Sequence, residues 1–260
     1  MSKTVITIAN QKGGSAKTTT AIHLSAALAE MGNSVLLCDL DAQGHVANYL
    51  GIQADELPTE ISDVFEGSRS LKEVILKDIR DRLDVAPANI RLADMEVSLA
   101  GATFREYRLK RILDKTALGY QFIILDCPPS LGLLTINGLM AADYVLIPMS
   151  CEYGAFLGVS RLLQTLAHFQ EEGNSSLEVL GLLHTHFRHT KDSRLIVDQT
   201  REKWGENVHI FPTPIADSTK FREAARLGKT IFEYAPEIPG ARAYREMAAK
   251  VLERRLGANG

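Results

Sequence analysis

The chain has 260 residues, of which 45% are hydrophobic and 23% are charged, and its formal net charge is −3. This length and composition are enough for one large hydrophobic core, which excludes a disordered polymer and a small disulfide scaffold. The nearly balanced charge excludes a protein that binds nucleic acid with its whole surface, so any contact with DNA must come from a local basic patch.

Short apolar strands alternate with amphipathic helices along the whole sequence. This alternation is typical of an α/β fold with a doubly wound, mostly parallel sheet and helices on both faces. We expect one domain over residues 1–260, with a polar surface excursion at 53–70. The predicted strands cover residues 4–9, 34–40, 82–86, 121–126, 143–149, 178–186 and 208–211. The predicted helices cover residues 18–31, 89–100, 104–117, 155–171, 193–205 and 241–256.

The first predicted strand runs directly into Asn-Gln-Lys-Gly-Gly-Ser-Ala-Lys-Thr-Thr-Thr, residues 10–20. A buried strand, a glycine-containing turn and a helix start together bind phosphates, because backbone N–H groups and the helix dipole point at the ligand. In such a loop Lys17 would reach the outer phosphates and the Thr18 hydroxyl would ligate Mg²⁺. The predicted nucleotide-binding residues of the loop are Lys12, Gly13, Gly14, Ser15, Ala16, Lys17, Thr18 and Thr19.

A second lysine, Lys12, makes the pattern Lys-Gly-Gly-x-x-Lys-Thr, which resembles the deviant Walker A motif of the ParA/MinD ATPases. In that family the early lysine contacts phosphates bound by the partner subunit, so the resemblance implies that Lys12 acts across a homodimer interface. The alternative is an ordinary glycine turn with two surface lysines. Ala16 stands where the family usually has glycine. If this position needs a positive φ, alanine adds strain of about 1 kcal/mol, and we expect nucleotide binding to survive it.

The second predicted strand ends in Asp39-Leu40-Asp41-Ala42-Gln43-Gly44. Carboxylates at positions i and i+2 of an extended strand point the same way, here at the carboxyl edge of the sheet, where ligands of such folds bind. Alone, this pattern is often a solvated loop. It resembles the family's Walker A′ motif, with Ala42 in place of the usual proline. The resemblance implies that Asp41 positions the attacking water and that Asp39 supports the metal shell.

The apolar run 122–125 is followed by Asp126, as in a Walker B strand, where the aspartate is bonded to Mg²⁺ through Thr18 or a water. The alternative is a buried strand with a helix-capping aspartate. The next segment, Pro-Pro-Ser-Leu-Gly at 128–132, resembles the switch segment of Soj-like ParA proteins and weighs against that alternative. Further segments resemble the same group, namely residues 87–93 with Glu96, 105–109, Cys-Glu-Tyr at 151–153, 228–232 and 240–244. The resemblance covers nearly the whole chain and is weakest at 53–80 and 188–210.

The resemblance implies a Mg²⁺-dependent ATPase with a slow intrinsic rate, whose ATP-bound homodimer binds DNA without sequence preference. A ParB-like partner would stimulate hydrolysis and reset the cycle. Lysine and arginine contacts to phosphates would supply the DNA affinity. For any single residue the alternative is a solvated helix face. The predicted DNA-binding residues lie in two basic clusters of the C-terminal half and are Arg188, Arg194, Lys220, Arg222 and Arg226.

The resemblance also places three residues near the adenine base: Thr185, at the end of a predicted strand, and Pro212 and Pro214 in a later loop. The spacing His-x-His-x-x-His at residues 184–189 raises a transition-metal site as an alternative. We favour a strand end with polar alternation, because no cysteine is nearby in the sequence.

The cysteines at 38, 127 and 151 are few and widely spaced, which predicts buried reduced thiols rather than a disulfide framework. The N-terminus has no signal segment, and no apolar stretch approaches the roughly 20 residues of a spanning helix. We therefore expect a cytoplasmic protein, nucleoid-associated in its ATP state, without a membrane partner. The few residues before the first strand leave no room for an N-terminal helix-turn-helix.

Two other classes of function stay open. A MinD-like regulator would anchor on membranes through the basic end of the predicted helix 241–256, although packing accounts for its narrow apolar stripe. The other class is a metabolic enzyme on the same fold, such as an amidoligase-like synthetase or a nitrogenase-iron-protein-like reductase. A bridging iron–sulfur cluster needs paired cysteines, for which Cys127 and Cys151 are a poor match.

Overall fold

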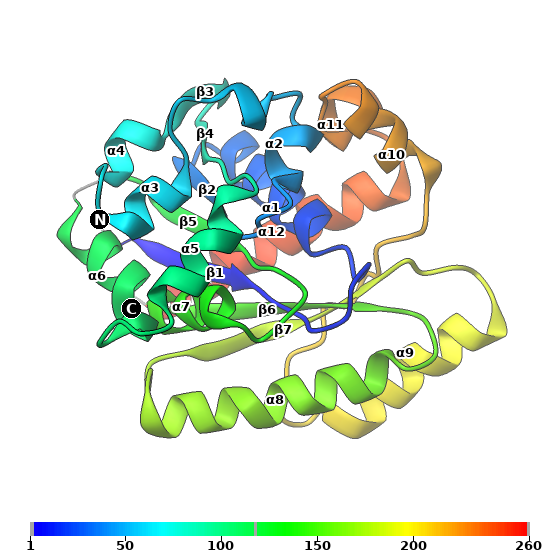
Figure 1. Cartoon of the computed structure of the whole chain (residues 1–260). Coiled ribbons are helices and arrows are strands. Elements are labelled where there is room, and N and C mark those ends of the chain that lie inside the picture. The colour runs from blue at the N-terminus through cyan, green and yellow to red at the C-terminus, as the bar shows by residue number, and fades with distance from the viewer. Residues whose placement is uncertain (1–2, 117–118, 259–260) are drawn as a thin grey trace.

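A seven-stranded sheet forms the centre of the computed structural model, which describes residues 3–116 and 119–258. The strand order is β3-β4-β2-β5-β1-β6-β7, and all neighbours are parallel except the antiparallel pair β3–β4. The doubly wound, mostly parallel α/β fold is confirmed (Figure 1). The strands are β1 (Thr4–Ile8), β2 (Val35–Asp39), β3 (Leu76–Arg80), β4 (Leu83–Ala86), β5 (Phe122–Asp126), β6 (Tyr144–Ser150) and β7 (Glu178–Thr185).

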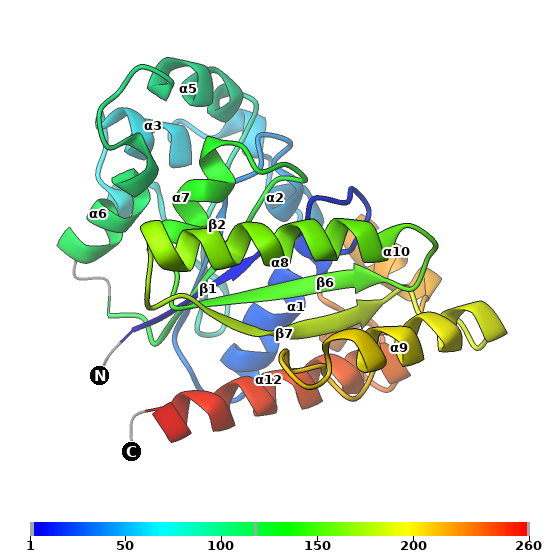
Figure 2. The ribbon, with the colours of Figure 1, turned by 90° about the horizontal axis from the view of Figure 1, so that it is seen from below.

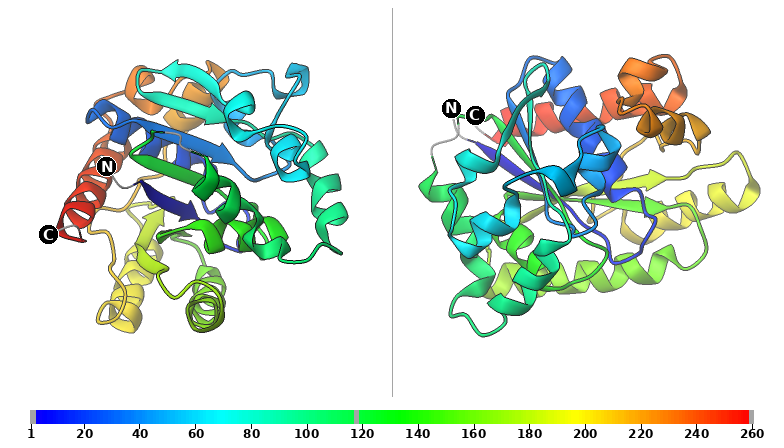
Figure 3. Two further views of the ribbon diagram at one scale, coloured as in Figure 1. Left: turned by 90° about the vertical axis from the view of Figure 1, so that its left-hand side faces the viewer. Right: turned by 45° about the horizontal axis from the view of Figure 1, so that its top comes forward.

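Helices cover both faces of the sheet, and the strands pass between the two helical layers (Figure 3). One layer contains α1, α2, α10, α11 and α12, whose apolar side chains form one core cluster. The other contains α3 to α8, whose side chains form the second cluster. The helices are α1 (Lys17–Glu30), α2 (His45–Tyr49), η1 (Ala54–Glu56), α3 (Ile61–Glu66), α4 (Leu71–Val74), α5 (Arg91–Leu99), η2 (Arg105–Tyr107), α6 (Arg108–Lys115), α7 (Leu133–Ala141), α8 (Ala155–Glu172), α9 (Lys191–Trp204), α10 (Thr219–Arg226), α11 (Ile231–Tyr234) and α12 (Pro239–Ala258).

The inner strands are apolar on both faces because helices cover both sides, as is usual for parallel sheets. Every residue of β1, β2 and β5 is buried. The antiparallel strand β3 lies at one edge, at the top of Figure 1, and β7 lies at the other. Viewed from below, α8 and α9 flank β6 and β7 (Figure 2).

One predicted strand is wrong, and one strand was not predicted. Residues 208–211 form only an isolated bridge, Leu182 to Ile210, because the chain continues into Pro212, which has no N–H to extend a ladder. The edge strand β3 was not expected, since its sequence Leu-Lys-Asp-Ile-Arg is polar and half-exposed.

Two predicted segments differ in detail. Residues 53–70 are not wholly a surface excursion, because α3 buries Ile61 and Phe65 completely. The predicted helix 104–117 begins as the 3-10 turn η2 and continues as α6 to Lys115, and its predicted last residue lies outside the described residues.

The fold brings three strand ends together. Asp126, the last residue of β5, is in register with Ile8 at the end of β1 and with Asp39 at the end of β2. The loop after β1 and the acidic ends of β2 and β5 therefore share the carboxyl edge of the sheet, where doubly wound folds bind ligands.

Candidate functional site

The loop between β1 and α1 is held in place by its own side chains. Asn10 accepts a hydrogen bond from the Lys12 backbone N–H at 3.0 Å and donates one to the Pro148 carbonyl at 2.5 Å. The Thr185 hydroxyl donates to the Ser15 carbonyl at 3.1 Å, which ties the loop to the end of β7. The loop conformation is thus fixed by β6 and β7 as well as by β1.

Helix α1 begins without a capping side chain. Its N-cap residue is Ala16, no side chain caps the first turn, and the first turn contains no acidic residue. The first N–H groups of such a helix lack intrahelical acceptors and carry its positive dipole end, so an anion can satisfy them. Ala16 has φ 64° and ψ 33°, in the left-handed region, as does Gly14 with φ 71°. The condition under which Ala16 carries backbone strain is therefore met.

Lys17, at the start of α1, is 7% exposed, and its ammonium donates to the Lys12 carbonyl at 3.3 Å. Burial lowers the pKa of Lys17, and the nearby carboxylates of Asp126 and Asp41 oppose that effect. The Lys17 ammonium is thus near two carboxylates and donates to a backbone carbonyl. A phosphate can take the place of that carbonyl as its acceptor.

Asp39 and Asp126 lie side by side at the ends of β2 and β5, and both are fully buried. Asp39 accepts hydrogen bonds from the N–H groups of Asp41 at 2.9 Å and Val46 at 3.2 Å. Neither carboxylate oxygen of Asp126 has a hydrogen-bond partner in the described part of the chain. Burial raises the pKa of Asp126 to about 7, against the effects of Thr18 and Lys17. Burial and the adjacent Asp126 raise the pKa of Asp39 well above its usual range.

Buried carboxylate oxygens without donors are unstable as anions unless a cation compensates them. The orphaned oxygens of Asp126 therefore fit a divalent ion, with the Thr18 hydroxyl nearby. No group of three or more His, Cys, Asp or Glu residues able to hold a metal occurs within residues 3–116 and 119–258. One or two carboxylates, a hydroxyl and waters are the donor set that Mg²⁺ takes beside a phosphate.

Lys12 forms an ion pair within its own chain. Its ammonium lies 2.8 Å from Glu152 Oε2 and 3.1 Å from Ser150 Oγ, both just beyond or at the end of β6. The Lys12 side chain is 30% exposed and that of Glu152 59%. The pair stands at the surface beside the loop, so it exchanges at little cost, since exposed ion pairs contribute about 0–1 kcal/mol.

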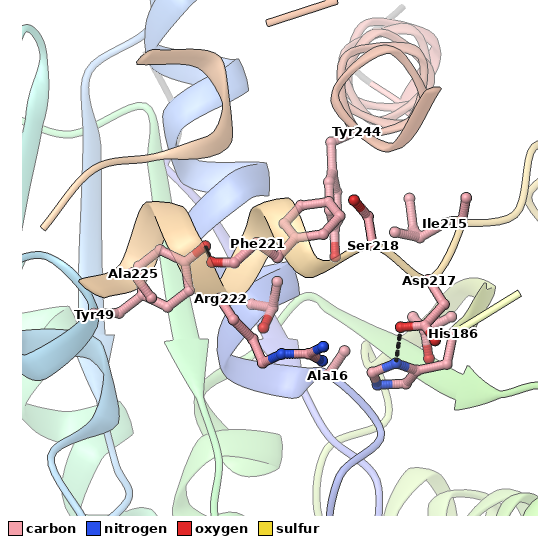
Figure 4. A pocket seen from close by; sticks show the side chains of 13 residues that line it. Ala16, Tyr49, His186, Ile215, Asp217, Ser218, Phe221, Arg222, Ala225 and Tyr244 are labelled. Carbon is pink, nitrogen blue, oxygen red and sulfur yellow. Dashed lines mark hydrogen bonds and ion pairs between the residues drawn. The ribbon is translucent and has the colours of Figure 1, made fainter. Parts of the chain in front are cut away.

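A pocket of about 260 Å³ adjoins the loop. Ala16, Thr19 and Thr185 line it, as predicted residues, together with a segment that the sequence did not single out, residues 215–218. Figure 4 shows aromatic side chains from α2, α10 and α12 around it and the Arg222 guanidinium directed towards Ala16. Pro212 lines a different pocket, beside α12, and Pro214 lines neither. The additional lining residues are Tyr49, His186, Ile215, Ala216, Asp217, Ser218, Phe221, Ala225 and Tyr244.

The predicted DNA-binding residues differ in the partners that they have within the chain. Arg188 pairs with Asp217 at 2.8 Å and Lys220 with Glu223 at 2.7 Å, which neutralises both. Arg222 lines the pocket beside the loop. Arg194 and Arg226 have no ion pair among the residues that the structure describes. Two of the five residues are thus paired with carboxylates inside the chain.

The next residues are the histidines at and just after the end of β7 and the three cysteines. Burial lowers the pKa of His184 to about 4, and the His186 ring lies 3.6 Å from Asp217. All three cysteines are buried and free, and burial raises the pKa of Cys151 to about 12. In the described part of the chain no helix is long and apolar enough to cross a membrane.

The chain is similar to known proteins along nearly its whole length. The family model described as an AAA domain matches residues 3–179. The chain is 39% identical over 248 residues to the sporulation initiation inhibitor protein Soj of Bacillus subtilis (strain 168), covering 95% of this chain and 97% of Soj. It is 36% identical to the chromosome partitioning protein ParA of Caulobacter vibrioides, covering 96% of this chain and 94% of that protein.

Among solved structures, the chain resembles cobyrinic acid a,c-diamide synthase from Mycobacterium smegmatis with bound ATP analog and magnesium. The TM-score is 0.86 at 36% identity, covering 99% of this chain and 97% of that chain. The chain therefore aligns over nearly its whole length both with chromosome partitioning proteins and with a protein named as a synthase.

Proposed function

The chain belongs to the ParA/Soj-type ATPases, and from this family membership we propose that it is a positioning ATPase of DNA or another cargo, with ATP and Mg²⁺ as cofactors. The observation that carries the proposal is the carboxyl edge of the sheet. An uncapped helix start, a buried Lys17 and the unpartnered oxygens of Asp126 meet there. We further propose that residues 1–260 act as one domain.

Each residue of the edge has a role in this proposal. The loop N–H groups and Lys17 hold the phosphates and balance their charge. Thr18 and Asp126 hold Mg²⁺, which supplies charge neutralisation during phosphoryl transfer. Asp39 fixes the loop 39–46 through its two backbone hydrogen bonds. Asp41, 8% exposed and directly after β2, orients the attacking water.

The dimer is the second part of the proposal. Lys12 leaves its ion pair with Glu152 and reaches the phosphates bound by the partner subunit when ATP brings two copies together. The exposed position of this pair supports the exchange, because little stability is lost when it breaks. The ATP-bound dimer then binds DNA through backbone phosphates, and a ParB-like partner stimulates the slow hydrolysis that resets it.

A synthetase is the rival function, because the Mycobacterium smegmatis relative carries that name. A synthetase that takes its nitrogen from glutamine needs a reactive thiolate nucleophile. All three cysteines of this chain are buried, and burial raises the thiol pKa of each, so none of them is suited to that role. The described thiols therefore favour the positioning ATPase.

The test is binding of labelled random-sequence duplex DNA to the full chain with Mg²⁺ and ATP, with Mg²⁺ and ADP, and without nucleotide, at two salt concentrations. Asp41→Ala holds the ATP state. We expect binding only with ATP, and weaker binding at the higher salt. An absence of DNA binding in every state would refute the DNA part of the proposal.

Lys12→Ala tests the dimer. We expect it to abolish ATP-dependent dimerisation in light scattering while ATP still binds, because Lys17 and the loop remain. Glu152→Gln serves as the control, since it breaks the same ion pair and keeps the lysine. A Lys12→Ala dimer of normal strength would show that this lysine has no role across the interface.

A further inference from the structure

A second basic site lies far along the chain from the phosphate loop. A pocket of about 220 Å³ between α3 and α6 is lined by four cationic side chains and by no acidic one. The exposed ring of Phe104 lines the same pocket. The four cationic residues, from here on the α6 row, are Arg105, Arg108, Arg111 and Lys115.

Each acidic group around the α6 row is paired with a cation, and only Glu106 is paired with a member of the row itself. Glu106 pairs with Arg105 at 2.9 Å, and Asp63 pairs with Arg91 at 3.3 Å on the neighbouring helix. Asp114, also on α6, lies 3.2 Å from Lys3 and 3.8 Å from Lys110. The α6 row therefore keeps a net positive charge.

Within residues 3–116 and 119–258, Arg111 and Lys115 have no ion pair. Arg108 donates from Nη2 to the Glu66 carbonyl at 3.0 Å, while its Nε–H is shielded from solvent and has no acceptor in that same range. A shielded donor without an acceptor is costly unless a ligand supplies one. Among the described residues, this pocket thus presents to a ligand two cationic side chains without an ion pair and one N–H donor without an acceptor.

Phe104 holds one of these cations in place. Its ring is 60% exposed, and the Arg111 guanidinium stacks over it, 5.0 Å from the ring centroid. The residue has φ 57°, an uncommon conformation for a bulky side chain and one found at functional sites more often than elsewhere. Stacking restricts the arginine, so less side-chain entropy is lost when the guanidinium binds an anion.

We propose that the α6 row binds the phosphate backbone of duplex DNA and is a contact surface of the DNA-bound state. The inference rests on the DNA binding proposed above and assigns it to a surface outside the C-terminal half. At the helical rise of 1.5 Å per residue the row is about 15 Å long, which is enough for its cations to face more than one backbone phosphate. The planar guanidinium groups suit phosphate oxygens, which they bind with two parallel N–H donors.

The experiment compares the wild type with Arg111→Gln/Lys115→Gln in ATP-dependent binding of random-sequence duplex DNA over a range of salt. Loss of two phosphate contacts lowers the salt slope by about 1.8 per protomer and weakens binding roughly tenfold or more at 0.1 M salt. The control Lys110→Gln/Arg242→Gln removes two exposed charges outside the row, one from the opposite face of α6. It is expected to change both quantities much less.

Three further measurements separate the outcomes. Thermal unfolding and ATP affinity of the α6 variant should match the wild type, because neither side chain contacts the phosphate loop. Arg111→Lys/Lys115→Arg should restore the salt slope, since it keeps both charges. Wild-type binding with an unchanged α6 variant would overturn this inference alone. Wild type that binds no DNA in any nucleotide state would overturn the proposed DNA binding as well.

Discussion

Ala16 stores backbone strain that glycine would release. Its φ of 64° and ψ of 33° place it in the left-handed region, which costs an L-residue roughly 1–2 kcal/mol. Ala16→Gly removes that cost but adds about 0.4–1 kcal/mol of unfolded-state entropy. We therefore expect the variant to be more stable than the wild type by about 0.5–1 kcal/mol, which corresponds to a rise in Tm of roughly 1–4 °C for a chain of this size.

The assay is urea unfolding of the nucleotide-free chain, checked by thermal unfolding. Ala249→Gly is the matched control, because Ala249 lies inside α12, where the same substitution removes a good helix former and should destabilise by about 1 kcal/mol. The same change is thus expected to have opposite signs at two positions. Equal destabilisation at both would refute the argument that Ala16 is strained.

Two other predictions concern the same edge of the sheet. Without Mg²⁺ or nucleotide, the pKa of Asp126 is about 7 in the folded chain, well above its usual value. The folded chain therefore holds this proton more tightly than the unfolded chain, and its free energy of unfolding falls as the pH rises from about 4 to above 7. Asp126→Asn should therefore be more stable than the wild type at pH 8, by up to about 4 kcal/mol, and gain little at pH 4; an equal difference at both pH values contradicts this. Gly44→Ala should destabilise by more than about 2 kcal/mol in urea, because φ is 60° and a Cβ would lie 2.7 Å from the Ala88 carbonyl. Gly13→Ala, with nothing within 4 Å of its Cβ, should be nearly neutral in comparison.

The strand ends of the site were predictable because a short, continuous sequence pattern marks each of them. The apolar run of β5 ends in Asp126, and that of β2 ends in Asp39, so period and polarity alone place both at the carboxyl edge. The register that puts these two side by side also follows from a parallel sheet once their strands are neighbours. The alternation of strands and helices predicted the fold class, which the sheet confirms, whereas the family was predicted from resemblance and is confirmed by the relatives.

The wall of the pocket beside the loop could not be predicted in the same way. Tyr49, Phe221 and Tyr244 come from α2, α10 and α12, and none belongs to a local pattern that marks a ligand site. Their side chains look like ordinary core aromatics in the sequence. Pro212 and Pro214 were chosen by resemblance, and the residues that line the pocket beside the loop, 215–218, follow them in the sequence. Only tertiary packing decides which residues of such a loop face the pocket.

His23 explains how these distant aromatics are held around the loop helix. It is fully buried in α1, its Nδ1 bonds the Thr19 carbonyl at 2.7 Å, and its Nε2 accepts the Ile231 N–H at 2.9 Å. Since Nε2 accepts, Nδ1 carries the proton and the ring is neutral, in agreement with a pKa lowered to about 4 by burial. The ring stacks on Tyr244 with centroids 5.1 Å apart and meets Tyr49 edge-on.

One neutral imidazole thus joins the helix that follows the phosphate loop to α11 and α12 near the end of the chain. The pocket beside the loop exists only because the last third of the sequence packs onto its first tenth. A boundary between an N-terminal nucleotide domain and a C-terminal domain would have to cut through this packed cluster. For that reason the contacts of His23 support the proposal that residues 1–260 act as one domain.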